Sequence, residues 1–340
     1  MVCAHCRQGI QGRYTQVGKL AFHPEHFLCR ACEGPIRGQF NMHQGMWLHP
    51  HCYQERYAPR CAGCGEALAG RFVKFEGRAY HEPCYGKQHG KPCAVCRQLI
   101  VGPMLTDYWG NQYHARHAQE VGACHYCDRL VHPAITGGGT TYGDGRVICR
   151  GCHKTAVHRE REGLLTVERV KARMAGWGVD LSGIALPVRF IDRLQLARML
   201  KGGPHASVKR VSGFASMATE RQGRVVTKKQ ATVYLLTGMP LESLEATAAH
   251  ELMHVWNFHH CPPHAFALEE GSCNYMSYRM HEGHAEPMRG YYLDALMKDP
   301  HPAYGVGFRK VKRYVDRHGF EAMLGLLRRS RDFPLLDALF

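Results

Sequence analysis

The chain has 340 residues, of which 45% are hydrophobic, and it carries a formal net charge of +15 and 16 cysteines. A chain of this length can hold two or more domains. It contains no run of 18 apolar residues, so we expect no membrane span, and its first residues lack the apolar stretch of a secretory signal. We therefore expect a cytoplasmic protein, whose cysteines bind metal rather than form disulfides. The excess positive charge is spread over both halves, which favours a solvated basic surface over a dedicated nucleic-acid site.

Fourteen of the cysteines lie before residue 153, and they fall into five sets of four ligands. In each set, two cysteines separated by two residues are followed, after 16 to 21 residues, by a second Cys or His pair with the same separation. The intervening stretch is long enough for a β-hairpin that returns the second pair to the same metal. Four protein ligands leave no open coordination position, so we expect about five structural zinc ions. The predicted sets are Cys3, Cys6, His23 and His26; Cys29, Cys32, His49 and Cys52; Cys61, Cys64, His81 and Cys84; Cys93, Cys96, His114 and His117; and Cys124, Cys127, Cys149 and Cys152.

The distances between these sets predict how the modules are grouped. Only two residues separate the first set from the second, a spacing typical of a LIM domain, in which two zinc knuckles share an apolar seam. We predict a LIM domain over 1–55, a single module over 56–90 and a degenerate LIM-like pair over 91–153. LIM domains usually bind proteins, whereas other zinc ribbons bind nucleic acid, and spacing alone does not decide between them. We favour a protein partner for this array.

Residues 154–340 form the second predicted domain, with a mixture of helices and strands. Two apolar segments read as strands, and the remaining periodic segments read as helices. A helix follows Pro240, with Ser243 as its N-cap, and ends at Cys261-Pro262-Pro263 because proline cannot donate the helical hydrogen bond. The predicted class is α+β, with helices over 154–173, 243–260, from 268 onward and over most of 304–340, and strands over 185–191 and 231–237.

The predicted helix after Pro240 contains the sequence H-E-L-M-H at residues 250–254. Positions i and i+4 of a helix share one face, so His250 and His254 can reach a single Zn²⁺. Glu251 is then placed to act as a base on a water molecule at that metal. A carboxylate from the helix that opens at Leu268 can supply a third ligand, which leaves the fourth position open, as a catalytic zinc requires.

Several motifs together resemble a known family. A LIM-like pair stands ahead of H-E-L-M-H-V-W (250–256), L-E-E-G-S-C-N (268–274) and Y-G-V-G-F-R (304–309). On these motifs the chain resembles the LIM-containing DA-one zinc peptidases, known from plants as ubiquitin-activated regulators of organ size. The resemblance covers the first LIM, the degenerate LIM and essentially all of 154–340, whereas Cys61 to Cys84 looks like an insertion. The compact chain suits a bacterial-type relative.

The resemblance implies a zincin-like, specifically gluzincin-like, endopeptidase that cuts specific protein substrates. It also implies that His250, His254 and Glu270 hold one catalytic zinc and that Glu251 is the base. Glu269 and Glu270 cannot both face the metal, because successive helical residues point about 100° apart. We assign Glu270, since Gly271 follows it as in related zinc peptidases. Glu269 is then expected to face solvent or to pair with a basic neighbour.

The remaining assignments leave alternatives open. Asn274, one turn after Glu270, can hydrogen-bond a histidine ligand. Tyr304 is a possible oxyanion donor, beside candidates that sequence does not separate: Tyr275, Tyr278, His281 and His284. The histidines at 259, 260 and 264 around Cys261 suggest a second metal cluster, but Pro262 and Pro263 favour a loop there.

Two other functions remain possible at this stage. The chain can be a zinc-ribbon adaptor or nucleic-acid-binding protein with an inactive peptidase domain, although the intact Glu251 argues against inactivity. Alternatively, the array can act as a lid that keeps a peptidase cleft closed until a partner binds.

Overall fold

The computed structural model describes residues 1–100, 102–201, 211–223 and 225–334. Internal contacts divide the chain into two compact units: the first comprises Met1–Leu105 and Gln112–Ala115, and the second Thr106–Asn111 and Arg116–Phe340. Small two-stranded hairpins dominate the first unit, and helices around a small sheet dominate the second. The predicted α+β class is confirmed. No helix in the described part of the chain is long and apolar enough to cross a membrane.

Each of the first three zinc modules contains a hairpin with a two-residue turn. The pairs are β1 (Thr15–Val17) with β2 (Leu20–Phe22), β3 (Asn41–His43) with β4 (Met46–Leu48), and β5 (Val73–Phe75) with β6 (Arg78–Tyr80). The turn between β3 and β4 consists of Gln44 and Gly45, whose φ angles are both positive, at 45° and 79°. This left-handed geometry matches the twist of the flanking strands. A short helix after each hairpin carries the second ligand pair: η1 (Pro24–His26), α1 (Pro50–Arg56) and α2 (Glu82–His89).

An apolar seam joins the first two modules, as expected for a LIM domain. The ring of Trp47 lies 5.0 Å from that of Phe22 and 5.4 Å from that of Phe27, centroid to centroid. Leu48 and Ile36 are buried in the same cluster. Because the seam uses side chains from both modules, the two knuckles pack as one small domain.

The fifth zinc module belongs to the second compact unit. It contains α4 (Pro133–Thr136), the hairpin of β9 (Gly139–Thr141) and β10 (Val147–Cys149), and α5 (Arg150–Lys154). The paired strands of the fourth module, β7 (Met104–Thr106) and β8 (Gln112–His114), belong almost entirely to the first unit, whereas α3 (His117–Glu120) belongs to the second. Sequence placed the boundary between 153 and 154, where the cysteines end, whereas the contacts divide the chain near residue 106. Cysteine content reports which segments bind metal and does not report how they pack.

Polar contacts join the fifth module to other segments of the second unit. Arg146, only 3% exposed, donates from Nη2 to the carbonyl of Thr237 at 2.6 Å. The indole of Trp109 donates to the carbonyl of Cys127 at 2.7 Å. The hydroxyl of Tyr291 donates to Asp128 at 2.6 Å. The short strands β11 (Ala156–Val157) and β15 (Met239–Pro240) form an antiparallel pair in this unit.

The second unit contains a three-stranded sheet in the order β12–β14–β13, with β12 (Val188–Ile191), β13 (Gly213–Gln222) and β14 (Val225–Leu236). Strand β12 runs parallel to β14, and β13 runs antiparallel to it. The segments predicted as strands correspond to β12 and to the second half of β14. Sequence did not predict β13, which is an edge strand of this sheet.

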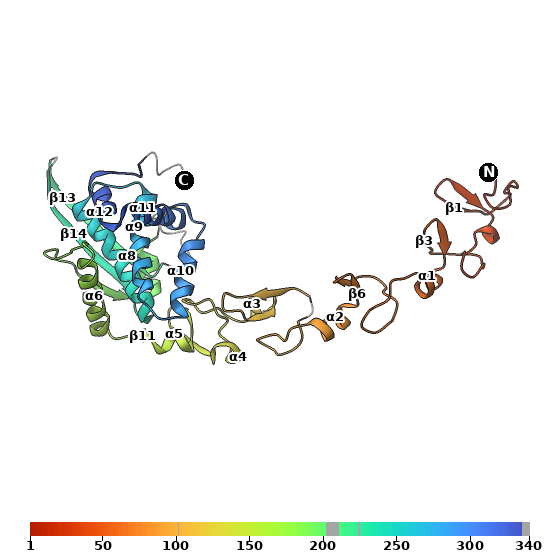
Figure 1. Ribbon diagram of the computed structural model, residues 1–340, viewed down its shortest axis with the longest axis horizontal. Coiled ribbons are helices and arrows are strands. Elements are labelled where there is room, and N and C mark those ends of the chain that lie inside the picture. Colours follow the sequence, from red (N-terminus) through yellow and green to blue (C-terminus); the bar gives the residue numbers. More distant parts are fainter. Residues whose placement is uncertain (101, 202–210, 224, 335–340) are drawn as a thin grey trace. The chain divides into compact units, whose positions relative to one another are not determined.

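Helix α8 (Leu241–His260) is the centre of the second unit and packs against the sheet, α6 (Glu160–Ala175) and α9 (Phe266–Glu282) (Figure 1). It begins two residues earlier than predicted, so Ser243 lies inside its first turn, where its hydroxyl is 2.7 Å from that of Tyr292. It ends before Cys261, as predicted. The other helices are α7 (Arg193–Met199), α10 (Met288–Lys298), the π-helical turn η2 (Pro302–Val306), α11 (Gly307–His318) and α12 (Phe320–Arg329).

Candidate active site

The two histidines of the H-E-L-M-H sequence lie on one face of α8, as the helical spacing requires. The Nε2 atoms of His250 and His254 are 3.2 Å apart. Helix α9 brings a carboxylate to the same point: Oε2 of Glu270 is 3.3 Å from Nε2 of His250 and 3.6 Å from Nε2 of His254. Three donor atoms from two antiparallel helices therefore form a compact triangle.

The dimensions of this triangle fit a tetrahedral zinc ion. Ligand atoms about 2.0–2.2 Å from zinc in a tetrahedron are separated by roughly 3.4 Å. Glu270 is 1% exposed, and among the described residues its Oε2 has no hydrogen-bond partner despite the two nearby imidazoles. A buried carboxylate oxygen of this kind needs a compensating charge. Burial alone raises the pKa of Glu270, but the imidazoles of His250 and His254 hold it well below its ordinary value.

Glu251 lies on α8 beside the triangle and faces the first residues of β13. It is 7% exposed, and the backbone N–H of Ala215 donates to its carboxylate. Gly213 lies so close that a Cβ there would come within 2.9 Å of Cγ of Glu251. Burial raises the pKa of Glu251. A raised pKa makes a carboxylate a stronger base than an exposed one.

A cavity of about 740 Å³ opens over these side chains. His250, Glu251 and His254 form one wall, and the edge strand β13 forms another through Gly213, Phe214, Ala215 and Met217. The turn η2 and the residues before it complete the lining with Asp299, Pro300, His301 and Tyr304. The candidate base and the candidate metal ligands thus share a space that an extended chain can enter beside a strand edge.

The sequence did not predict the contacts that Asn274 and His301 make with the η2 segment. Asn274 donates from Nδ2 to the carbonyl of Tyr304 at 3.0 Å, instead of to a histidine ligand, so it holds the η2 segment. His301 was not singled out from the sequence. Its Nδ1 accepts the backbone N–H groups of Ala303 and Tyr304 at 3.2 and 3.3 Å, so in the neutral ring the proton is on Nε2. Tyr304 itself lines the cavity. Of the other proposed oxyanion donors, Tyr275, Tyr278, His281 and His284 are not among the lining residues.

Glu269 does not point to bulk solvent. Its side chain is 22% exposed and lies between two histidines, 2.9 Å from Nδ1 of His254 and 2.7 Å from Nδ1 of His264. The expectation of a basic neighbour is met by His264, whereas the contact with His254 was not foreseen. His264 lies in the loop between α8 and α9 and faces this carboxylate.

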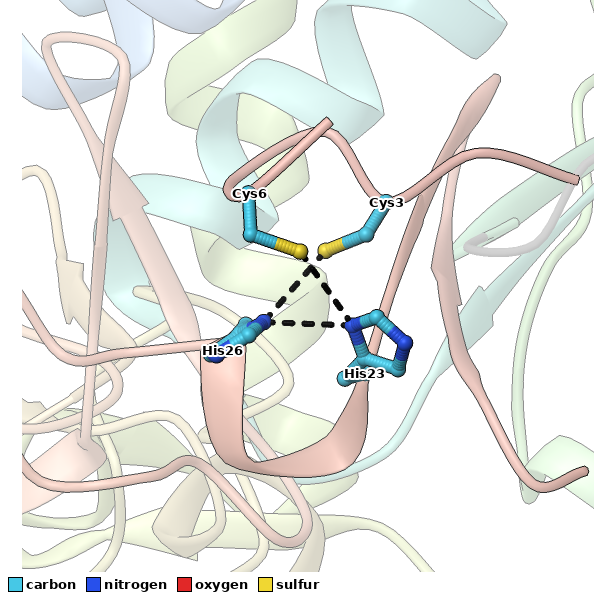
Figure 2. Close-up of side chains that lie close together, drawn as sticks. All are labelled: Cys3, Cys6, His23 and His26. Atoms are coloured by element: carbon cyan, nitrogen blue, oxygen red, sulfur yellow. Dashed lines mark hydrogen bonds between the residues drawn. The ribbon is translucent and has the colours of Figure 1, made fainter. Parts of the chain in front are cut away.

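The five N-terminal ligand sets also converge. In each, one ligand atom from every member lies within 4.8 Å of the others. Figure 2 shows the first set, in which Nδ1 of His23 is 3.2 Å from Nδ1 of His26 and 3.5 Å from Sγ of Cys6. His26, which stands where a LIM cysteine is expected, lies 3.7 Å through Nδ1 from Sγ of Cys3. These separations match tetrahedral zinc with N and S ligands, and the clusters indicate zinc binding.

Two histidines of the array are held by their second ring nitrogen. Nε2 of His49 is 3.3 Å from the carbonyl of Pro35, and Nε2 of His114 is 3.2 Å from that of Leu99. A carbonyl only accepts, so Nε2 carries the proton and Nδ1 presents its lone pair to the metal. Burial alone raises the pKa of Cys29, but backbone N–H groups, that of His49 foremost, lower it to about 6. Such stabilisation of the thiolate favours metal ligation.

Comparison with known proteins identifies a LIM domain and distant homologues. Residues 3–57 match the LIM domain family. The chain is 23% identical to LIM domain-containing protein HDR3 of Oryza sativa subsp. japonica, over 98% of this chain and 74% of that protein. It is 24% identical to Protein DA1-related 2 of Arabidopsis thaliana, over 98% and 70% of the two chains. A shorter stretch of the chain is 42% identical to PDZ and LIM domain protein 7 of Homo sapiens, over 18% of this chain and 14% of that protein.

These comparisons show a LIM domain near the N-terminus and a distant similarity to plant DA1-related and LIM proteins. The predicted LIM domain is confirmed, and the Cys/His clusters indicate zinc binding. The homology to DA1-related proteins is distant, at 22–24% identity, but it extends along nearly the whole chain.

Proposed function

We propose that this protein is a zinc-dependent endopeptidase that hydrolyses peptide bonds of specific protein substrates. The observation that carries the proposal is the triangle of His250, His254 and Glu270, with Glu251 beside it. His250, His254 and Glu251 line one cavity. A purely structural zinc site uses four protein ligands and has no need of an adjacent carboxylate. Three ligands and a free carboxylate match the needs of hydrolysis.

In this proposal the three ligands hold one catalytic zinc. Zinc held there supplies Lewis acidity toward a water molecule and toward the scissile carbonyl. Glu251 removes a proton from that water as it attacks the carbonyl carbon, and later gives the proton to the leaving amine. Tyr304 and His301 both line the cavity, and we propose them as donors to the developing oxyanion.

The edge strand β13 provides a way to orient the substrate. Its neighbour in the sheet, β14, occupies one side only, and Gly213 to Ala215 line the cavity. An extended peptide can add to such an edge through main-chain hydrogen bonds, which fix direction without requiring a particular sequence.

The N-terminal array is proposed to bind proteins. The apolar seam of the LIM domain is buried, and its four-ligand sites are closed, so the array has no evident chemical role. LIM domains generally mediate protein–protein contacts, and we assign this one to substrate or partner recognition. About five structural zinc ions are proposed for the array.

A peptide-mixture experiment tests the proposal. Zinc-loaded full-length protein is incubated with a complex mixture of unfolded polypeptides, and new chain ends are identified by mass spectrometry. The proposal expects cleavage that a chelator abolishes, that zinc restores and that Glu270→Ala lacks. Absence of zinc-dependent cleavage, together with tight and steeply salt-dependent binding of mixed nucleic acid, would instead favour a nucleic-acid-binding protein with an inactive domain.

A further inference from the structure

The carboxylate of Glu269 joins two buried imidazoles, only one of which belongs to the proposed metal site. Its Oε1 is 2.9 Å from Nδ1 of His254, and its Oε2 is 2.7 Å from Nδ1 of His264. The side chain of His254 is 10% exposed and that of His264 is fully buried. Because His254 turns Nε2 toward Glu270, its Nδ1 must carry the proton that Glu269 accepts.

Both ring nitrogens of His264 face atoms that only accept hydrogen bonds. Nδ1 faces Glu269, and Nε2 is 2.9 Å from the backbone carbonyl of Leu327. Each nitrogen must therefore carry a proton, so His264 is an imidazolium that compensates the buried charge of Glu269. Burial alone lowers the pKa of His264, but Cys261, Glu269 and the carbonyl of Leu327 raise it to about 10.

The loop that carries His264 is fixed by the C-terminal part of the second unit. Leu327 lies on α12 and is completely buried. One residue after His264, the backbone N–H of Ala265 donates to the carbonyl of Arg331 at 2.6 Å. Two consecutive loop residues are thus tied to the end of α12 and the residues after it.

We infer that Glu269 and His264 are positioning residues for the zinc ligand His254, and that the end of α12 holds them in place. The inference rests on the proposed catalytic zinc and adds a chain of contacts from Leu327 through His264 and Glu269 to His254. A carboxylate that accepts from the outer nitrogen of a histidine ligand fixes its tautomer and ring orientation and raises its basicity. His264, through Nδ1, holds that carboxylate in place inside the protein.

Zinc affinity of the full-length protein tests this role without relying on activity. Each variant is titrated with zinc at buffered free concentrations. The dissociation constant is measured for the one zinc ion that wild type binds and Glu270→Ala does not. Glu269→Ala is expected to weaken binding of that zinc by about 10- to 100-fold. Glu269→Gln keeps an oxygen that accepts from His254 and should recover part of the loss. His264→Gln, which can reach only one of its two partners, is expected to weaken binding by about tenfold.

A matched control and the array zincs separate positioning from general unfolding. Glu282→Ala, an exposed carboxylate at the end of the same helix, should bind zinc as wild type does. Every variant should keep the zinc of the array and its circular dichroism spectrum. One outcome would overturn this inference and leave the proposed catalytic zinc standing. In it, Glu270→Ala lacks one zinc that wild type binds, but Glu269→Ala and His264→Gln bind that zinc as tightly as wild type does. Equal zinc content in wild type and Glu270→Ala would overturn the proposed catalytic zinc, and the inference with it.

Discussion

A Cβ atom on Gly213 would lie 2.9 Å from Cγ of Glu251. The same atom would lie 2.7 Å from Cγ2 of Thr247, one turn earlier on α8. Both distances are shorter than a side chain tolerates, so the first residue of β13 has no room for one. The edge strand and the helix that carries Glu251 therefore approach each other at a separation that only glycine allows.

Gly213→Ala should lower peptidase turnover by on the order of 10²-fold, because the added methyl group displaces either Glu251 or the strand edge. Zinc content should stay unchanged, since the three atoms nearest to the added methyl group belong to Thr247 and Glu251 and to none of the proposed ligands. Gly143→Ala is a suitable control, because a Cβ there meets no atom within 4 Å and its φ is not positive. Equal turnover in the two variants would show that the close approach does not position Glu251.

Elemental analysis of the purified protein should find about six zinc ions per chain, five in the array and one at the proposed active site. The latter should leave first under a chelator, because three protein ligands hold it instead of four. Only one or two zinc ions in a folded sample would contradict the five-module assignment.

The zinc ligand sets could be read from sequence because their information is local. A pair of cysteines separated by two residues, a stretch of hairpin length and a second pair specify one knuckle without reference to the rest of the fold. The same holds for His250 and His254, whose relation depends only on helical periodicity. The turn of Gln44 and Gly45, which needs two left-handed residues, is local in the same way.

Contacts between distant segments could not be predicted in this way. Strand β13 begins with Gly-Phe-Ala-Ser-Met and has six exposed residues at its far end, so its sequence carries little strand signal. Asn274 was expected beside a histidine but bonds to Tyr304, because the position of η2 depends on how α9 and α11 pack. The role of Glu269 depends on His264, which in turn contacts the carbonyl of Leu327, more than 60 residues after His264. Sequence periodicity contains none of these relations.

Arg146→Leu should destabilise the second unit by about 3–5 kcal/mol, since it leaves Asp144 buried without its partner 2.8 Å away. Denaturant unfolding of the full chain, followed by tryptophan fluorescence, measures this, and Arg161→Leu on the exposed side of α6 is the control. Burial alone raises the pKa of Asp144, but hydrogen bonds from Arg146 and the backbone of Arg193 lower it. The contribution of this ion pair to the free energy of unfolding is therefore present above the ordinary aspartate pKa. It is lost as the pH falls through the lowered pKa of Asp144. A variant as stable as its control at neutral pH would refute the contribution of this pair.

A fragment that starts at residue 106 should fold, whereas one that starts at residue 154 should be unstable or aggregate. The shorter fragment loses the fifth zinc module and with it the contacts of Arg146, Trp109 and Asp128. Circular dichroism and thermal unfolding of the two fragments compare them directly. A cooperative unfolding transition in the shorter fragment at the temperature of the longer one would argue that the module is dispensable.

The central claim is that Glu251 acts as the base of a zinc peptidase, and Glu251→Gln tests it most directly. The variant keeps the size and shape of the side chain, so its zinc content and circular dichroism should equal those of wild type. Its rate of cleavage of a polypeptide that wild type cuts should fall by about 10²- to 10⁴-fold. Cleavage at the wild-type rate by a variant with full zinc content would contradict the account.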